Sequence, residues 1–196
     1  MTSPVVRLAS VSPRRRELLA QIGVAHVVTG AHIDESVRAG EKAQDYVQRM
    51  ARTKAQAVWD KHRDLPVLAA DTSVVLDGIV FGKPQDRSDA AQMLGLLSGR
   101  THDVLTAVAL ASEGGISMRM SESSVRFRPL TDAEIAVYWE SGEPQDKAGA
   151  YAVQGLAAVF IESLTGSYSG VMGLPLFETA EILRAAHVPV WCTMGA

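Results

Sequence analysis

The sequence predicts a mixed α/β (α+β) fold in which helices flank a mixed β-sheet. Three observations lead to this class. Strand patterns and helix patterns alternate along the first half of the chain, and strand patterns then cluster in the middle. No internal repeat, linker or low-complexity tract interrupts the sequence. Its 196 residues suffice for a single domain, residues 1–196, with a sizeable core or two small lobes that share a cleft.

The N-terminal part of the chain is expected to hold two strands around a short helix. Residues 5–9 form an apolar strand segment. Ser12 is a good N-cap and Pro13 suits the first helical position, so a helix should follow at once. Gly23 stands where that helix would end, and residues 24–28 form a second strand segment. A polar loop then leads to the next helix.

The middle of the chain carries an acidic residue between two apolar runs. The runs, residues 67–70 and 74–76, favour strand structure and enclose Asp71. A tight-turn pair at residues 77–78 then leads the chain back toward Lys83. A carboxylate buried between strands is costly unless a cation meets it. We therefore expect Asp71 to be either an ion-paired structural residue or a working group on the floor of an active site.

Periodicity and capping signals place the remaining elements. Apolar residues recur at three- and four-residue steps where helices are expected, and Thr131 with Glu134 forms a capping-box pattern. Helices are expected at residues 42–59, 88–97, 131–139 and 176–186. Strands are expected at residues 104–110, 116–127 and 157–161, and a loop at residues 166–175.

The composition excludes several classes of function. The chain has 19 Lys and Arg against 22 Asp and Glu, a net charge of −3, so no global field attracts nucleic acid polymers or an anionic membrane. A polyanionic ligand must be held by a local cluster of cations. The single cysteine, Cys192, excludes an intrachain disulfide framework and fits a reducing compartment. Neither a signal-like segment nor a membrane-spanning apolar run is found, so we expect a cytoplasmic protein without membrane contact.

An arginine run at the start of the first helix is a candidate binding site. Arg14 and Arg15 fall in the first helical turn, where the helix dipole disfavours a cation by roughly a few tenths of a kcal/mol. A bound anion would satisfy both the arginines and the free backbone N–H groups. The alternative is a solvated basic helix start without a ligand, and this segment alone leaves both open.

Asp71, Thr72 and Glu35 are candidate groups for a reacting centre. Asp71 could hold a divalent cation or polarise a water molecule. Thr72 could donate a hydrogen bond to a ligand, or it simply favours β structure. Glu35 lies in the polar loop and is either a surface residue or a second carboxylate for a hard cation, which takes oxygen ligands and keeps several waters.

Three lysines accompany these segments. Taken singly, Lys54, Lys83 and Lys147 fit solvated side chains better than catalytic ones. Lys83 is held in a turn between Gly82 and Pro84, directly after the central strands. Lys147 lies in a run of small residues that can approach a ligand closely.

Short motifs occur in order over nearly the whole chain. They are Ser-Val-Ser-Pro-Arg-Arg at 10–15, Ala-Arg-Thr-Lys-Ala at 51–55, Ala-Asp-Thr at 70–72, Gly-Lys-Pro at 82–84, Asp-Lys-Ala-Gly at 146–149 and Gly-Leu-Pro at 173–175. Together they resemble the Maf family of nucleotide pyrophosphatases. The resemblance implies an elongated mixed sheet with two lobes and a central cleft, similar to the inosine triphosphate pyrophosphatases. It also implies metal-dependent hydrolysis of a nucleoside triphosphate to monophosphate and diphosphate, a house-cleaning role and a homodimer.

Three positions distinguish branches of this family. Arg14, Thr72 and Gln154 resemble the branch that acts on dTTP and UTP, with modified pyrimidine nucleotides as further candidates. The branch that acts on 7-methyl-GTP tends to have Trp, Gln and Glu there. The resemblance therefore implies a dTTP/UTP pyrophosphatase. The alternatives are a 7-methyl-GTP pyrophosphatase and a nucleotide-binding regulator of septum formation that does not cleave its ligand.

The resemblance also implies roles for the candidate residues. Water would attack the α-phosphorus, with Asp71 as its proton acceptor or as a metal ligand, and Glu35 would share the Mg²⁺ or Mn²⁺ ion. Thr72 and Gln154 would read the edge of the base. The expected catalytic residues are Asp71, Lys83, Lys54 and Arg15. The expected substrate-binding residues are Ser10, Arg14, Arg15, Thr72, Lys147 and Gln154, and the expected metal ligands are Glu35 and Asp71.

Overall fold

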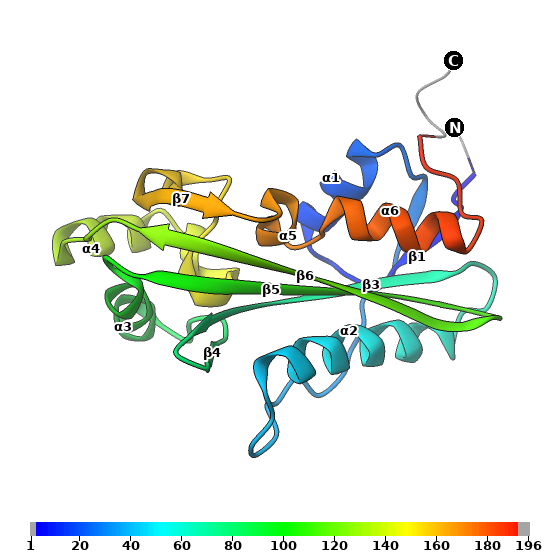
Figure 1. The fold of residues 1–196 in the computed structure, drawn as a ribbon, viewed down its shortest axis with the longest axis horizontal. Coiled ribbons are helices and arrows are strands. Elements are labelled where there is room, and N and C mark those ends of the chain that lie inside the picture. The colour runs from blue at the N-terminus through cyan, green and yellow to red at the C-terminus, as the bar shows by residue number, and fades with distance from the viewer. Residues whose placement is uncertain (1–2, 192–196) are drawn as a thin grey trace.

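A mixed β-sheet forms the centre of the computed structural model, which describes residues 3–191 (Figure 1). Its strands are β1 (Val6–Leu8), β2 (His26–Val28), β3 (Val67–Leu76), β4 (Ile79–Phe81), β5 (Thr101–Ser112), β6 (Gly115–Phe127) and β7 (Ile161–Thr165). The order in this seven-stranded sheet is β2-β1-β3-β5-β6-β7, and β4 pairs with β3 outside this path. β1 is parallel to both of its neighbours, and the other pairs are antiparallel. The predicted mixed α/β class is confirmed.

Helices cover both faces of the sheet. The α-helices are α1 (Pro13–Gln21), α2 (Ala43–Trp59), α3 (Arg87–Leu97), α4 (Asp132–Glu140), α5 (Tyr168–Met172) and α6 (Leu176–Ala185). Short 3₁₀ helices are η1 (Glu143–Asp146), η2 (Ala148–Ala150) and η3 (Leu156–Phe160). In Figure 1, α2 lies along one face of the sheet, and α1, α5 and α6 lie on the other.

The two covered faces explain why the central apolar run is almost continuous. Leu68 and Ala70 of β3 share a core cluster with α1 and α6, whereas Val67 and Ala69 share one with α2. Successive side chains of a strand point to opposite faces, so a strand covered on both faces is apolar at nearly every position. Asp71 follows the same alternation as Ala69 and therefore points toward α2.

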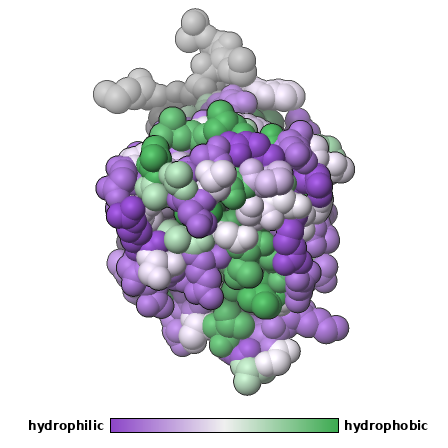
Figure 2. Space-filling model, turned by 90° about the vertical axis from the view of Figure 1, so that its left-hand side faces the viewer, coloured by the Kyte–Doolittle hydropathy of each residue, from purple (hydrophilic) through white to green (hydrophobic). Residues whose placement is uncertain are grey.

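The left-hand end of the molecule in Figure 1 carries α3, α4 and β7. Its core contains Phe127, Tyr138 and Phe160, whose rings meet edge to face. Figure 2 views this end and shows a strip of apolar surface between hydrophilic margins. Val137 of α4 and Val159 of η3 are 73% and 70% exposed. This end thus combines a buried aromatic core with exposed apolar side chains.

The strand predicted at residues 157–161 is wrong over most of its length. The helix η3 occupies Leu156–Phe160, and β7 begins only at Ile161. Ala157 and Phe160 are buried, and the two residues between them are exposed. Buried residues three positions apart fit the three residues per turn of a 3₁₀ helix, whereas a half-buried strand would bury every second residue.

The loop predicted at residues 166–175 contains a short helix, α5. Its N-cap is Ser167, whose hydroxyl accepts a hydrogen bond from the backbone N–H of Gly170 at 3.0 Å. The helix ends at Gly173, where φ is +121° and favours glycine. The chain therefore makes one ordered turn where the sequence indicated an irregular connection.

β7 pairs with only the C-terminal part of β6. The pairing runs from Ser124 with Thr165 to Phe127 with Ile161. Over residues 115–123, the described strand that pairs with β6 is β5, on its other side. The N-terminal part of β6 is therefore an edge of the sheet.

Two expectations concern cellular context. No helix within residues 3–191 is long and apolar enough to cross a membrane. Cys192 lies outside the described residues, so the expectation of a reducing compartment stays a prediction.

Candidate active site

A cleft of about 660 Å³ gathers every residue predicted for the site. Its walls come from the loop after β1, the loop before α2, α2 itself, β3, the turn after β4 and the segment around η1 and η2. The predicted residues in its lining are Ser10, Arg14, Arg15, Glu35, Lys54, Asp71, Thr72, Lys83, Lys147 and Gln154. Segments that are far apart in the sequence therefore converge on one cavity.

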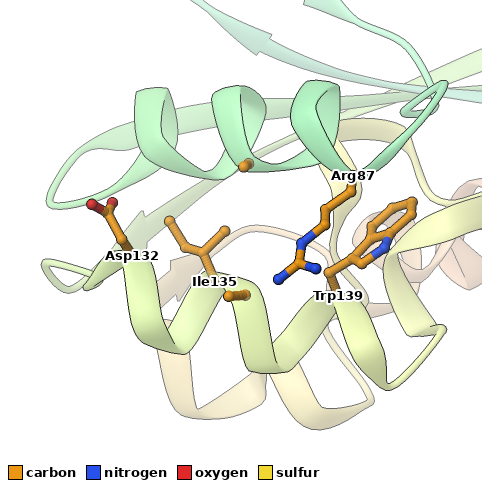
Figure 3. Close-up of a pocket in the computed structure, with 6 residues that line it drawn as sticks. Arg87, Asp132, Ile135 and Trp139 are labelled. Atoms are coloured by element: carbon orange, nitrogen blue, oxygen red, sulfur yellow. The ribbon is translucent and has the colours of Figure 1, made fainter.

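A smaller hollow lies between α3 and α4 (Figure 3). It measures about 130 Å³, and Arg87, Asp132, Ile135 and Trp139 are among the residues that line it. Pockets that bind small molecules usually measure roughly 300–1,000 Å³. The guanidinium of Arg87 also already pairs with Glu140 at 3.0 Å. The larger cleft is therefore the candidate active site.

Asp71, Lys54 and Glu35 form a charged group on the α2 face of the sheet. The Nζ of Lys54 lies 2.7 Å from Asp71 Oδ1 and 3.1 Å from Glu35 Oε1. The side chains of Lys54 and Asp71 are 10% and 9% exposed, whereas that of Glu35 is 50% exposed. A single ammonium thus joins a buried carboxylate to one at the mouth of the cleft. The ion pair expected for Asp71 is present inside the cleft, so the structural and functional interpretations of Asp71 are compatible.

Burial and nearby charge act on Asp71 in opposite directions. Loss of solvent raises the pKa of its carboxyl group, and the charges of Lys54 and Arg15 oppose that rise. Burial also lowers the pKa of the Arg15 guanidinium, which Asp71 in turn opposes. A carboxylate with a raised pKa is a better proton acceptor than a solvated one.

A chain of hydroxyl groups fixes Arg15. Its Nε donates to the carbonyl of Gly173 at 2.8 Å, and its Nη2 lies 3.3 Å from Thr72 Oγ1. The hydroxyl of Thr106 lies 3.0 Å from Thr72 Oγ1 and 2.8 Å from the carbonyl of Gly170. A carbonyl can only accept, so the Thr106 proton goes to Gly170 and the Thr72 proton goes to Thr106. Thr72 therefore offers its oxygen, as an acceptor, to the cleft.

The start of α1 presents cations without a side-chain cap. Ser12 occupies the N-cap position as predicted, but its hydroxyl bonds no helix N–H. The hydroxyl of Ser10 instead accepts from the Ser12 N–H at 3.2 Å. Arg14 Nη1 lies 3.3 Å from the carboxylate of Asp146, which also pairs with Lys147. Sequence reasoning did not single out Asp146, although the residue lies in the quoted Asp-Lys-Ala-Gly motif.

The loop that carries Glu35 is tied to α2. The Tyr46 hydroxyl donates to the Glu35 carbonyl at 2.9 Å, and Arg49 Nη2 donates to the Ser36 carbonyl at 3.0 Å. Burial raises the pKa of Tyr46 to about 12, and the nearby Asp71 and Glu35 add to the rise. Sequence reasoning missed this role of Tyr46 because the helical pattern indicates only one more apolar position on the buried face of an amphipathic helix.

The remaining predicted residues lie at the rim. Lys83 is exposed, and the preceding Gly82 accepts a hydrogen bond from the Gly149 N–H at 3.0 Å. This bond ties the turn after β4 to the segment that carries Lys147. Gln154 is exposed and also lines the cleft. The cleft therefore has buried charge at its floor and exposed polar groups at its rim.

The donor set suits a hard divalent cation that brings further ligands. Within residues 3–191, no group of three or more His, Cys, Asp or Glu side chains is placed to hold a metal. Asp71 and Glu35 supply two carboxylates, and Mg²⁺ is usually bound through one or two carboxylates together with substrate phosphates and waters. These residues therefore fit a metal that is shared with a phosphorylated ligand.

Fold and site together define a class of protein. The sheet presents a buried carboxylate paired with lysine, and arginines and lysines from distant segments surround it in one cleft. Such a cluster of cations suits a polyanionic small molecule, and a buried carboxylate suits a proton acceptor. A family model described as "Maf-like protein" matches residues 5–186, and the chain belongs to that family.

The curated relatives cover almost the whole chain. The chain is 53% identical over 196 residues to the "dTTP/UTP pyrophosphatase" of Bordetella parapertussis, with 95% of both chains covered. It is 51% identical over 187 residues to the protein of that name from Hahella chejuensis, with 94% of this chain and 93% of that chain covered. The resemblance drawn from the motifs is confirmed.

The comparison with solved structures gives matches of low sequence identity. A HAM1 protein from Staphylococcus aureus matches with a TM-score of 0.47 and 13% identity, covering 62% of this chain and 71% of that chain. A nucleoside-triphosphatase / dITP/XTP pyrophosphatase from Mycobacterium abscessus matches with a TM-score of 0.45 and 15% identity, covering 94% and 98%.

Proposed function

We propose that the chain is a nucleoside triphosphate pyrophosphatase that hydrolyses dTTP and UTP to the monophosphate and diphosphate. The observation that carries the proposal is the convergence of Asp71, Lys54 and Glu35 with the arginines of α1 in one cleft. The names of relatives at 51–53% identity support the reaction and the pyrimidine substrates. Arg14, Thr72 and Gln154, which indicated this branch of the family, all line the cleft.

In this proposal Asp71 either accepts a proton from the attacking water or, as a metal ligand, orients that water. The water oxygen forms a bond to the α-phosphorus, the bond from that phosphorus to the bridging oxygen breaks, and diphosphate leaves with the electron pair. Burial raises the pKa of Asp71, which strengthens it as an acceptor, while Lys54 holds it in place. Asp71 and Glu35 would hold Mg²⁺ or Mn²⁺, which when bound neutralises phosphate charge.

The cations around the cleft neutralise the triphosphate. Arg15 is oriented by Gly173 and Thr72, so its remaining N–H donors are fixed before the ligand arrives. Phosphate oxygens compete with Asp146 for Arg14 and Lys147. Lys54 and Lys83 complete this set. Preorganised donors of this kind stabilise charge that develops in the transition state.

In this proposal Gln154 and Thr72 recognise the base. Gln154 offers an amide donor and acceptor, which suits the edge of a uracil or thymine ring. Thr72 contributes an acceptor oxygen, and Ser10 lies in the same lining. Modified pyrimidine nucleotides remain further candidate substrates.

A nucleotide panel with Mg²⁺ or Mn²⁺ tests the proposal. Diphosphate release should be fastest from dTTP and UTP, and Asp71→Asn should remove most of it while the fold persists. Asp77→Asn is the matched control because Asp77 is an exposed turn residue paired with Arg100. Preference for 7-methyl-GTP would overturn the pyrimidine assignment, and binding without release would favour the regulator of septum formation. Near wild-type turnover in Asp71→Asn would remove Asp71 from the mechanism.

We also propose that residues 1–196 form one domain of two lobes that works as a cytoplasmic homodimer. The core cluster around α3, α4 and η3, which is separate from the two clusters on either face of β3, supports the two lobes, and the nucleotide substrate supports the location. A second copy would bury the exposed Val137 and Val159. Light scattering after size-exclusion chromatography should give a dimer, and Val137→Asp should shift it to a monomer. A wild-type monomer at all concentrations would contradict the dimer.

A further inference from the structure

We propose that Glu143, at the start of η1, is a positioning residue. It holds in place both the segment that carries Gln154, which is proposed to read the base, and the side chain of Lys147, which is proposed to bind phosphate. The inference rests on the proposed function, because it assigns a role toward Gln154. Glu143 contacts both segments without touching the floor of the cleft where the reaction is proposed. Its side chain accepts hydrogen bonds from the segment that carries Gln154, and its main-chain carbonyl accepts one from Lys147.

The carboxylate of Glu143 begins the helix η3. Its Oε2 accepts from the Leu156 N–H at 3.0 Å, and its Oε1 lies 3.3 Å from the Ala157 nitrogen. These N–H groups belong to the first turn of η3, whose N-cap, Gly155, offers no side-chain cap. Glu143 therefore supplies from a distance the acceptors that a capping residue would give.

Gly155, next to Gln154, lies directly against this carboxylate. A Cβ atom at Gly155 would overlap the carboxylate oxygens of Glu143. Only glycine lets the backbone come this close to the carboxylate. The backbone that follows Gln154 therefore packs directly against the Glu143 side chain.

Tyr138 fixes the other side of the same segment. Its hydroxyl donates to Glu143 Oε1 at 2.7 Å and accepts from the Ala152 N–H at 3.2 Å. Tyr138 is only 4% exposed, and its ring packs edge to face on Phe160. Hydrogen bonds from this pair thus reach the chain both before and after Gln154.

The main chain of Glu143 completes the link. Its carbonyl accepts from Lys147 Nζ at 3.1 Å. A displacement of Glu143 would therefore move a base-reading amide and a phosphate-binding ammonium together. Glutamine is nearly the same size, but its NH₂ group cannot accept from Leu156 or Ala157, so it breaks the arrangement without removing bulk.

The test compares Glu143→Gln and Tyr138→Phe with the control Glu140→Gln, whose carboxylate pairs with Arg87 at the surface. The steady-state constants kcat and KM are measured for UTP and CTP. Separately, calorimetry measures the affinities for non-hydrolysable analogues of both nucleotides. Leaving a backbone donor unpaired should raise the KM for UTP by about tenfold in Glu143→Gln, with kcat changed by less than about threefold. The preference for UTP over CTP should fall by a similar factor. Tyr138→Phe should act in the same direction, and Glu140→Gln should leave both quantities unchanged.

The outcomes separate the two proposals. Loss of thermal stability with an unchanged UTP-to-CTP ratio would reduce Glu143 to a structural residue and overturn the inference, and Tyr138→Phe decides the matter if Glu143→Gln does not fold. A wild type that cleaves no nucleotide refutes the proposed function, while the ratio of analogue affinities still decides the role of Glu143. A wild type that binds neither analogue overturns both.

Discussion

Lys54 forms ion pairs with two carboxylates, those of Asp71 and Glu35, so its substitution is expected to lower the free energy of unfolding. Asp71 and Lys54 are both buried, so the loss of one leaves an unpaired charge in a poorly solvated place. Breaking such a pair is far more costly than breaking a surface ion pair. The cluster that serves the proposed chemistry is therefore also a structural element.

We expect Lys54→Met to lower the free energy of unfolding by about 3 kcal/mol near pH 8. Burial raises the folded-state pKa of Asp71 above its ordinary value of 3.8, and loss of Lys54 raises it further. The variant is then no less stable than the wild type at a pH where Asp71 is protonated in both folded and unfolded chains. Its loss of stability grows as the pH rises through the folded-state pKa of Asp71. Urea unfolding at pH 4 and pH 8 measures this, with the exposed Lys61→Met as control. An equal loss at both pH values would contradict the assignment.

His102 gives a pH dependence of the opposite sign. Burial lowers its pKa to about 4, and its Nε2 lies 2.9 Å from the Tyr151 hydroxyl. The unfolded chain takes up a proton near pH 6.5, before the folded chain does, so stability falls as the pH drops below that value. We expect a loss of about 3 kcal/mol between pH 7 and pH 4. Urea unfolding of His102→Gln should lack this loss, whereas the exposed His187→Gln should retain it.

At the level of residues, sequence reasoning found the groups that carry charge into the cleft. It could not find Thr106, Tyr138 or Glu143, because their roles depend on partners that are distant in the sequence. Thr106, for instance, contacts Gly170 across 64 positions. Motifs reveal residues whose chemistry is distinctive, whereas ordinary residues acquire a role only from their place in the fold.

Among the elements, α5 links helix capping to the site. Ser167 caps the helix, and the carbonyls of Gly170 and Gly173 hold Thr106 and Arg15. A shift of this single turn would therefore release the arginine expected to bind the triphosphate.

We expect Ser167→Ala and Thr131→Ala each to lower the free energy of unfolding by about 1 kcal/mol, because each residue caps a helix. Only Ser167→Ala should also raise the KM for UTP, since Thr131 caps α4 and lies outside the cleft lining. Thermal unfolding and steady-state kinetics on both variants measure the two effects. Equal kinetic effects would show that α5 does not orient Arg15.

The elements themselves were predicted where periodicity was long. The long helix α2 and the antiparallel pair β5 and β6 were found because many residues repeat one pattern. η3 was mistaken for a strand because a short apolar run fits several structures. α5 was missed because a helix of five residues is shorter than the window that reveals helical periodicity.

For the whole molecule, the net charge of −3 and the basic cleft have opposite signs. Substrate attraction is therefore local and is sensitive to screening. We expect the KM for UTP to rise about fivefold between roughly 0.05 and 0.5 M NaCl, because the Debye length shrinks from more than 10 Å to less than 5 Å. Lys83→Gln should weaken this dependence, whereas Lys61→Gln, outside the cleft lining, should not. A KM that is independent of salt would contradict electrostatic capture of the phosphates.

The open side of β6 has a consequence for the behaviour of the protein at high concentration. Unpaired strand edges invite intermolecular cross-β association, the first step of many forms of aggregation. Arg119 and Glu122 are exposed within residues 115–123 and place both signs of charge there. A flexible peptide that docked along this stretch would have to strip water from both ions. The chain thus carries its own gatekeepers at this edge.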